Sequence, residues 1–116
     1  MTTYNKGDIV LVPFPFSDQT ATKKRPAVII SSKSYNNTSS DIVIMAITSK
    51  TDKTLTIEEC LINNWQDAGL LKLSVIKPAI STVEQTLVLK KLGRLSQRDL
   101  ISTENALIEF LDLRKT

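Results

Sequence analysis

Lys23, Lys24 and Arg25 are three consecutive cations that stand directly before a proline and an apolar run. Pro26 biases Arg25 toward an extended backbone, so its guanidinium is expected at the mouth of a strand. A guanidinium donates two hydrogen bonds to one phosphate from a planar fork, and neighbouring lysines add positive charge. The pattern predicts an anion site, and an exposed arginine that simply begins a strand is the alternative.

A second group of polar side chains follows the apolar run 41–47. Thr48 and Ser49 bring hydroxyls and Lys50 a cation to the end of this segment. Such hydroxyls orient a phosphate oxygen in some proteins and cap the backbone in others, and both readings remain open. Lys77 is a third candidate, a cation before a proline that would otherwise count as surface. Phe16 offers a ring either for stacking on a base or for packing at the end of a core.

The chain contains no histidine and a single cysteine, Cys60. Histidine acid–base catalysis, Ser-His-Asp triads, histidine metal sites and thiolate zinc sites are therefore excluded. Glu58 and Glu59 disfavour a thiolate beside them, so Cys60 is predicted to be a packed side chain. Any enzyme here has to use arginine, lysine, carboxylates, hydroxyls and backbone amides, and we expect no metal and no cofactor.

Length and composition predict one domain over residues 1–116, large enough to close a single core. The net charge of +3 permits a polyanionic partner without requiring one. With no possible intrachain disulfide, no visible signal peptide and no apolar run of membrane-spanning length, the sequence predicts a cytoplasmic protein.

Short apolar segments that are rich in β-branched residues predict a mainly β fold. Residues 33–40 are expected to form a turn, and Pro78 is expected to interrupt a strand. Ser96 is a good helix N-cap with Asp99 three residues later, and apolar residues recur after it at helical spacing. The sequence thus predicts a small β-barrel capped by a C-terminal helix. The expected strands are 9–12, 27–30, 41–47, 70–76 and 92–95, with a short one possible at 55–57 and a continuation possible at 80–83 after the proline break.

Several of these segments together resemble the PemK/MazF toxins over nearly the whole chain. The matching pieces are 7–10 (Gly-Asp-Ile-Val), 24–29 (Lys-Arg-Pro-Ala-Val-Ile), 47–49 (Ile-Thr-Ser), 69–70, 74–75 and 93–96. The resemblance implies an α+β, SH3-like barrel of five to seven strands and a two-fold symmetric homodimer. It also implies a type II toxin with a cognate antitoxin protein.

The activity implied by the resemblance is sequence-specific, metal-independent cleavage of single-stranded RNA. The 2′-hydroxyl of the RNA attacks the adjacent phosphorus and leaves a 2′,3′-cyclic phosphate. Arg25 and Thr48 fall on the best-supported catalytic positions of the family. The alternatives are a toxin on the same barrel that binds a protein such as DNA gyrase without catalysis, and a nucleic-acid-binding regulator.

The sequence departs from the family at residues 76–81, which read Ile-Lys-Pro-Ala-Ile-Ser. Many members carry an arginine or glutamine and an acidic residue here, whereas this chain has Lys77 alone and no carboxylate before Glu84. Lys77 is therefore the predicted proton carrier, and Asp18 is another carboxylate that could contribute. The predicted RNA-binding residues are Phe16, Asp18, Gln19, Lys23, Lys24, Ser49 and Lys50.

Overall fold

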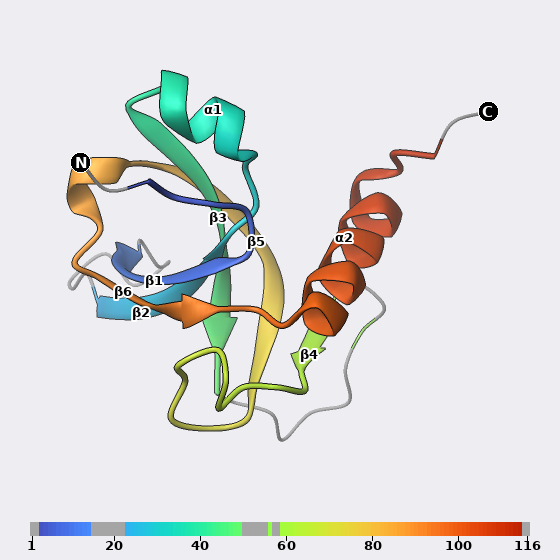
Figure 1. The fold of residues 1–116 in the computed structure, drawn as a ribbon. Helices are drawn as coiled ribbons and strands as arrows, with labels where there is room; N and C mark the ends of the chain where they lie inside the picture. The colour runs from blue at the N-terminus through green and yellow to red at the C-terminus, as the bar shows by residue number, and fades with distance from the viewer. Residues whose placement is uncertain (1–2, 15–22, 50–55, 57–58, 115–116) are drawn as a thin grey trace.

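The computed structural model describes residues 3–14, 23–49, 56 and 59–114. Within this part of the chain, six strands form one curled antiparallel sheet in the order β4-β5-β3-β2-β1-β6, with a helix at the C-terminal end (Figure 1). The mainly β class with a C-terminal helix is therefore confirmed. The elements are β1 (Asp8–Phe14), β2 (Lys23–Ile29), α1 (Lys33–Thr38), β3 (Asp41–Thr48), β4 (Cys60–Ile62), β5 (Ser74–Glu84), the 3-10 turn η1 (Gln85–Leu87), β6 (Lys90–Arg94) and α2 (Gln97–Leu111).

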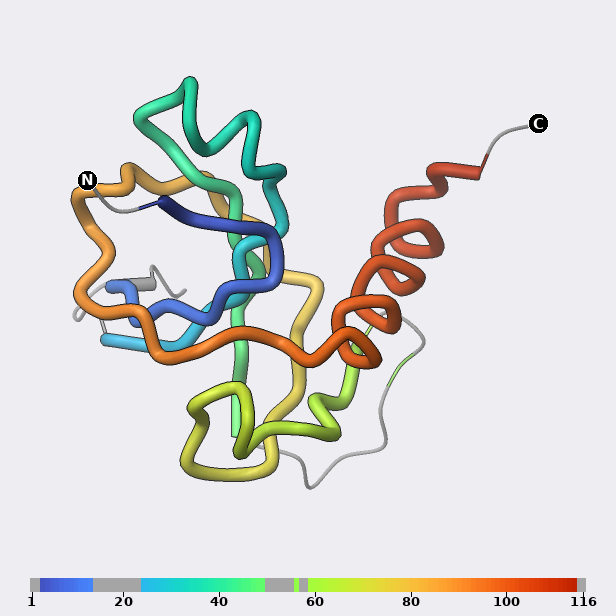
Figure 2. The backbone as a smooth tube through the Cα atoms, in the orientation of Figure 1, coloured from blue at the N-terminus to red at the C-terminus, as the bar shows by residue number. Residues whose placement is uncertain are grey.

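The sheet is covered on both faces, which explains why its central strands contain continuous apolar runs. Side chains alternate between the faces of a strand. In β3, Ile44 and Ala46 belong to one buried cluster, whereas Met45 and Ile47 belong to a second one. The chain curls around the first cluster, and the loop between β4 and β5 and helix α2 lie by the second (Figure 2).

Helix α2 begins as its sequence predicts. The Ser96 hydroxyl accepts a hydrogen bond from the Asp99 amide at 3.2 Å. The buried Asp99 carboxylate does not turn back to the cap but accepts the amide N–H groups of Asn63 at 3.2 Å and Asn64 at 2.8 Å. These bonds fasten the chain after β4 to the first turn of α2.

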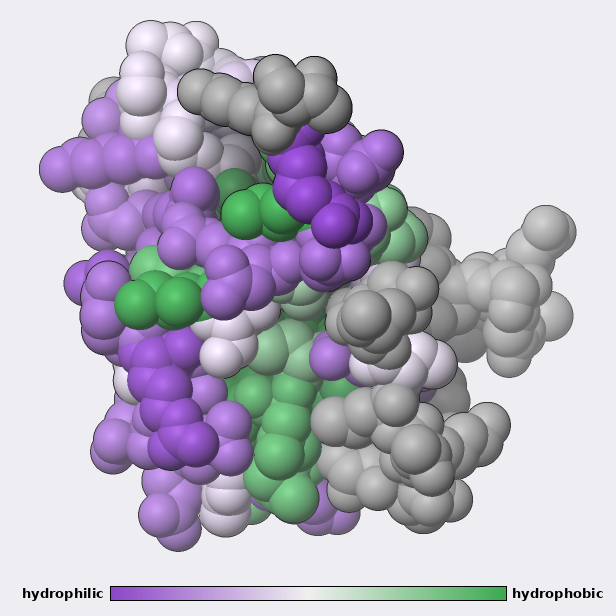
Figure 3. All heavy atoms as spheres, turned by 90° about the vertical axis from the view of Figure 1, so that its right-hand side faces the viewer, coloured by the Kyte–Doolittle hydropathy of each residue, from purple (hydrophilic) through white to green (hydrophobic). Residues whose placement is uncertain are grey.

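The apolar face expected for α2 is only partly buried. Leu100 and Leu107 pack against the second cluster. Ile101, Ile108 and Leu111 are exposed, so only part of this apolar face contributes to the core. Figure 3, which views the side of the molecule that carries α2, shows hydrophobic side chains at the surface among hydrophilic ones. No helix in the described ranges has the length and apolar character needed to cross a membrane.

Two further expectations are corrected by the structure. Residues 33–40 contain helix α1 rather than a turn, and the Ser32 hydroxyl caps it by accepting the Tyr35 amide at 3.1 Å. Strand β5 continues through Pro78 instead of stopping there. The pairing of β5 with β3 shifts register between the pairs Ile47–Ile76 and Met45–Ile80, and such an irregularity accommodates a residue without an N–H. The possible strand at 55–57 falls largely outside the described residues.

Candidate functional site

Arg25 and Thr48 lie level with one another on neighbouring strands. Ala27 of β2 pairs with Ala46 of β3, and extending this register by two residues brings Arg25 opposite Thr48. On its other side Arg25 pairs with Val12 of β1. Directly opposed residues of an antiparallel pair project from the same face of the sheet, so the guanidinium and the hydroxyl leave β2 and β3 on one side.

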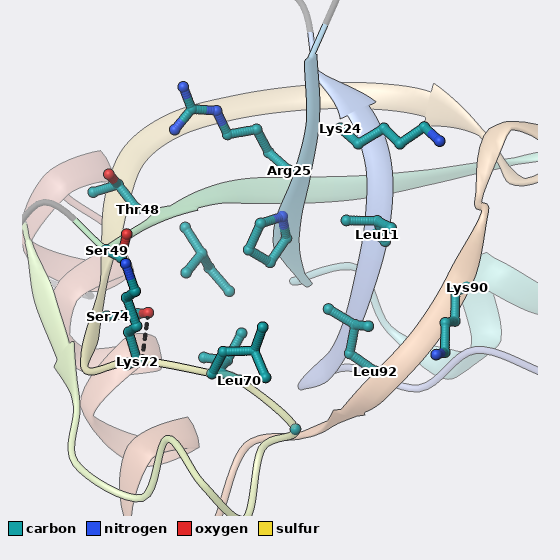
Figure 4. A pocket seen from close by; sticks show the side chains of 14 residues that line it. Leu11, Lys24, Arg25, Thr48, Ser49, Leu70, Lys72, Ser74, Lys90 and Leu92 are labelled. Carbon is teal, nitrogen blue, oxygen red and sulfur yellow. Dashed lines mark hydrogen bonds between the residues drawn. The ribbon is translucent and has the colours of Figure 1, made fainter.

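A cavity of about 660 Å³ opens beside these strand ends and includes both Arg25 and Thr48 in its lining (Figure 4). Part of its wall is apolar and comes from segments that are distant in sequence: Leu11 of β1, Leu70 of the loop before β5 and Leu92 of β6. The cavity therefore combines a hydrophobic wall with a cationic and hydroxylated margin.

Among the described residues, four cations line this cavity. Figure 4 shows Arg25 extending toward the end of β3 where Thr48 lies, while Lys24 extends in the opposite direction. Lys72 and Lys90 also line it, from the loop before β5 and from β6. Arg25 is half-buried and Lys24 is exposed, which distinguishes a held guanidinium from a solvated ammonium.

Hydroxyl groups gather where β3 ends and β5 begins. Thr48 and Ser49 line the cavity from β3 and the residue after it, and Ser74 lines it from the start of β5. The Ser74 hydroxyl donates to the Lys72 carbonyl at 2.9 Å, as the dashed line in Figure 4 marks. Arginine and threonine side chains on adjacent strand ends are suited to binding one phosphate group.

The wall segment at Leu70 depends on two glycines. Gly69 has a φ of +82°, and a Cβ added there would overlap the carbonyl oxygen of Leu92 in β6. A Cβ on Gly93 would likewise overlap the carbonyl oxygen of Ala68. The two backbones thus approach too closely for any side chain between them, and this contact brings Leu70 and Leu92 together at the cavity.

Lys77 is not in the lining of this cavity. Its ammonium forms an ion pair at 2.8 Å with Glu59, the residue directly before β4. The hydrogen bond from Lys77 and that from the Thr56 amide lower the pKa of Glu59 below its ordinary value of 4.5. The carboxylate is therefore ionised at neutral pH, and the ion pair is lost only as the pH falls through this lowered pKa.

The structure thus brings together Lys24, Arg25, Thr48 and Ser49 of the predicted site residues. It also adds two cations that sequence reasoning missed. Lys90 belongs to a basic cluster that is visible in the sequence, whereas its neighbour Lys91 does not line the cavity and pairs with the buried Asp8 at 3.3 Å. No pattern in the sequence indicates that Lys72 belongs to the site. Phe16, Asp18, Gln19 and Lys50 lie outside the described residues, and for Lys23 only the backbone, in β2, is described.

Solved structures with the same fold come from several bacteria. The toxin MazF-mt6 of Mycobacterium tuberculosis superposes with a TM-score of 0.77 at 16% identity, covering 93% of this chain and 99% of that chain. A mycobacterial endoribonuclease in complex with its cognate antitoxin gives 0.75 at 16% identity over 100% of both chains. MazF from Deinococcus radiodurans gives 0.76 at 16% identity, covering 97% of this chain and 99% of that chain. The curled sheet with its C-terminal helix is therefore a MazF-like fold.

The sequence itself identifies the family. The family model described as PemK-like, MazF-like toxin of type II toxin-antitoxin system matches residues 5–111, and a search of curated protein sequences gives no match. The chain belongs to the PemK-like, MazF-like family of type II toxins.

Proposed function

We propose that this toxin is a sequence-specific, metal-independent endoribonuclease that cleaves single-stranded RNA. The observation that carries the proposal is that the Arg25 guanidinium and the Thr48 hydroxyl leave adjacent strands on the same face, at the margin of the cavity that both residues line. Relatives of the same fold are named as endoribonucleases, which supports this activity.

The reaction needs no nucleophile from the protein, because the RNA supplies its own 2′-hydroxyl. The 2′-oxygen forms a bond to phosphorus, the bond from phosphorus to the 5′-oxygen breaks, and the 2′-hydroxyl proton leaves to solvent. Arg25 stabilises the negative charge of the phosphorane, and Thr48 donates a hydrogen bond that orients the phosphate. Lys77, as an ammonium, gives a proton to the departing 5′-oxygen.

The remaining charged side chains form the path along which the RNA lies. Lys24, Lys72 and Lys90 place positive charge around the cavity, and its apolar wall suits the faces of unpaired bases. Ser49 is placed to contact a phosphate or a sugar. We assign the further contacts to Phe16, Asp18, Gln19, Lys23 and Lys50.

Purified protein should cut a long single-stranded RNA of mixed sequence in buffer containing EDTA. The upstream fragments should end in a 2′,3′-cyclic phosphate and the downstream fragments should begin with a 5′-hydroxyl, because the RNA's own hydroxyl is the nucleophile. End-group analysis by mass spectrometry checks both termini, and the Arg25→Ala variant, prepared in parallel, controls for contaminating nucleases.

Loss of cutting in EDTA with recovery in magnesium would contradict the metal-independent mechanism. If RNAs of varied sequence are never cut, the protein-binding mode of action, with a target such as DNA gyrase, becomes the better interpretation.

We further propose that the toxin is a homodimer and that its partner in the cell is a cognate antitoxin protein. Family membership supports both, and a cavity at the end of one small sheet binds only a short stretch of RNA unless a second protomer extends it. Sedimentation at micromolar concentration should give twice the 12.9 kDa chain mass, and the antitoxin should suppress cleavage. A fully active monomer would contradict the dimer.

A further inference from the structure

We propose that Glu59 is a positioning residue that fixes the Lys77 ammonium on the face of the sheet that carries Thr48. The pair brings a carboxylate to Lys77 from outside residues 76–81, which contain none. This inference rests on the proposed RNA cleavage and adds to it a residue from a different part of the chain.

The strand register shows on which face of the sheet the ion pair lies. Thr48 of β3 pairs with Val75 of β5, and Val75 pairs with Leu61 of β4, so all three project from one face. Lys77 follows Val75 by two residues, about 7 Å along the strand. Because strand side chains alternate, its ammonium leaves β5 on the face that carries Thr48.

Glu59 lies on the same face of the sheet as Lys77. Cys60 pairs with Ile76, and both belong to the buried cluster on the other face. Residue 59 precedes Cys60 and therefore projects opposite to it, level with Lys77. The 2.8 Å ion pair is the result of this register, although the two residues are far apart in sequence.

The two side chains of the ion pair differ in how exposed they are. The Glu59 side chain is 13% exposed, whereas the Lys77 side chain is 46% exposed. The Thr56 amide donates to the second carboxylate oxygen at 2.9 Å, and the Glu59 amide donates back to the Thr56 carbonyl at 3.2 Å. A fixed carboxylate thus holds an ammonium that is more exposed than the carboxylate itself.

This geometry separates the roles of the two groups. Both oxygens of Glu59 already accept hydrogen bonds, so the carboxylate is not placed to take the proton of the 2′-hydroxyl. Lys77 keeps two protons for a ligand. In the cleavage step one passes from Nζ to the 5′-oxygen as its bond to phosphorus breaks, and the neutral amine then takes a proton from water.

A single-turnover comparison of Glu59→Gln with a matched control tests the proposal. The control is Glu104→Gln, which makes the same change of charge in the Lys6–Glu104 pair, 3.3 Å apart on the surface. Glu59→Gln should lower the maximal rate by on the order of tenfold, less than the ~10²-fold expected for loss of the proton donor itself in Lys77→Ala. Affinity for an uncleavable 2′-deoxy-substituted RNA should be unchanged in both glutamine variants.

A double-mutant cycle distinguishes positioning from an independent effect. If Glu59 acts through Lys77, then adding Glu59→Gln to Lys77→Ala should cause no further loss of rate. Multiplicative losses, or a Glu59→Gln rate equal to that of Glu104→Gln, would overturn the proposal. Should Glu59→Gln unfold, Glu59→Asp, which keeps the charge but shortens the reach, is expected to lose rate similarly, and a normal rate there overturns the proposal as well. Wild-type protein that never cuts RNA contradicts the proposed function itself, a different result.

Discussion

Replacement of Arg25 by alanine should slow RNA cleavage at saturating RNA by on the order of 10²-fold or more, by analogy with removal of an oxyanion-hole donor. The guanidinium is half-buried at the end of β2, where it shares a face of the sheet with Thr48. Arg25→Lys should restore only part of the rate, because an ammonium cannot donate two parallel hydrogen bonds from a planar fork. Single-turnover rates with an excess of enzyme measure this loss directly.

Lys24→Ala is the matched control for this experiment. Lys24 precedes Arg25 and lines the same cavity, but it is exposed and extends away from Thr48 in Figure 4. Its loss should weaken binding and reduce the slope of log affinity against log salt by about one, with little change in the saturated rate. A folded Arg25→Ala variant that cuts as fast as wild type would show that Arg25 is a surface residue without a catalytic role.

Gly69→Ala should be the most destabilising of the simple glycine replacements, with a loss of about 3 kcal/mol or more in the free energy of unfolding. At a φ of +82° an alanine is strained, and its Cβ would overlap the Leu92 carbonyl oxygen, which is backbone and cannot rotate away. The midpoint and slope of urea unfolding give the loss.

Gly7→Ala measures the cost of backbone strain without the steric overlap that occurs at Gly69. Gly7 has a similar φ of +94°, but the atoms nearest to its added Cβ belong to the Leu100 side chain, 3.4 Å away. This replacement should therefore cost only about 1–2 kcal/mol, the strain of a left-handed backbone. Equal losses at the two positions would mean that the close approach to β6 is relieved by a small shift of the loop.

Most of the strands and the main helix were predictable from local sequence. Strands β1, β2 and β3 each contain an unbroken apolar run because both faces of the sheet are buried, and Ser96 marks the beginning of α2 through a hydrogen bond made within its own first turn. The prediction of a turn at residues 33–40 was wrong. Asparagines and serines favour turns, but the cap at Ser32 and the burial of Asn36 favour helix α1. The path of β5 through Pro78 depends on its neighbours, which no local pattern reveals.

The candidate site was predictable where one segment contains the signal. Arg25 before its proline and Thr48 at the end of an apolar run are local patterns, and both line the cavity. Lys72 joins them only because a loop packs against β6. The partner of Lys77 could not be found from the sequence, since Glu59 stands beside Lys77 through the register of β4 and β5 rather than through proximity in the chain.

The hydrogen bonds of Asp99 have a consequence for local opening of the molecule. They fasten Asn63 and Asn64 to α2, and the chain runs from there directly into Gly69 and Leu70 at the cavity wall. We expect the amide hydrogens of these two asparagines to exchange with solvent when the first turn of α2 releases them. We therefore expect loosening of the first turn of α2 to loosen this part of the cavity wall as well, although Asp99 follows the wall by some thirty positions in the sequence.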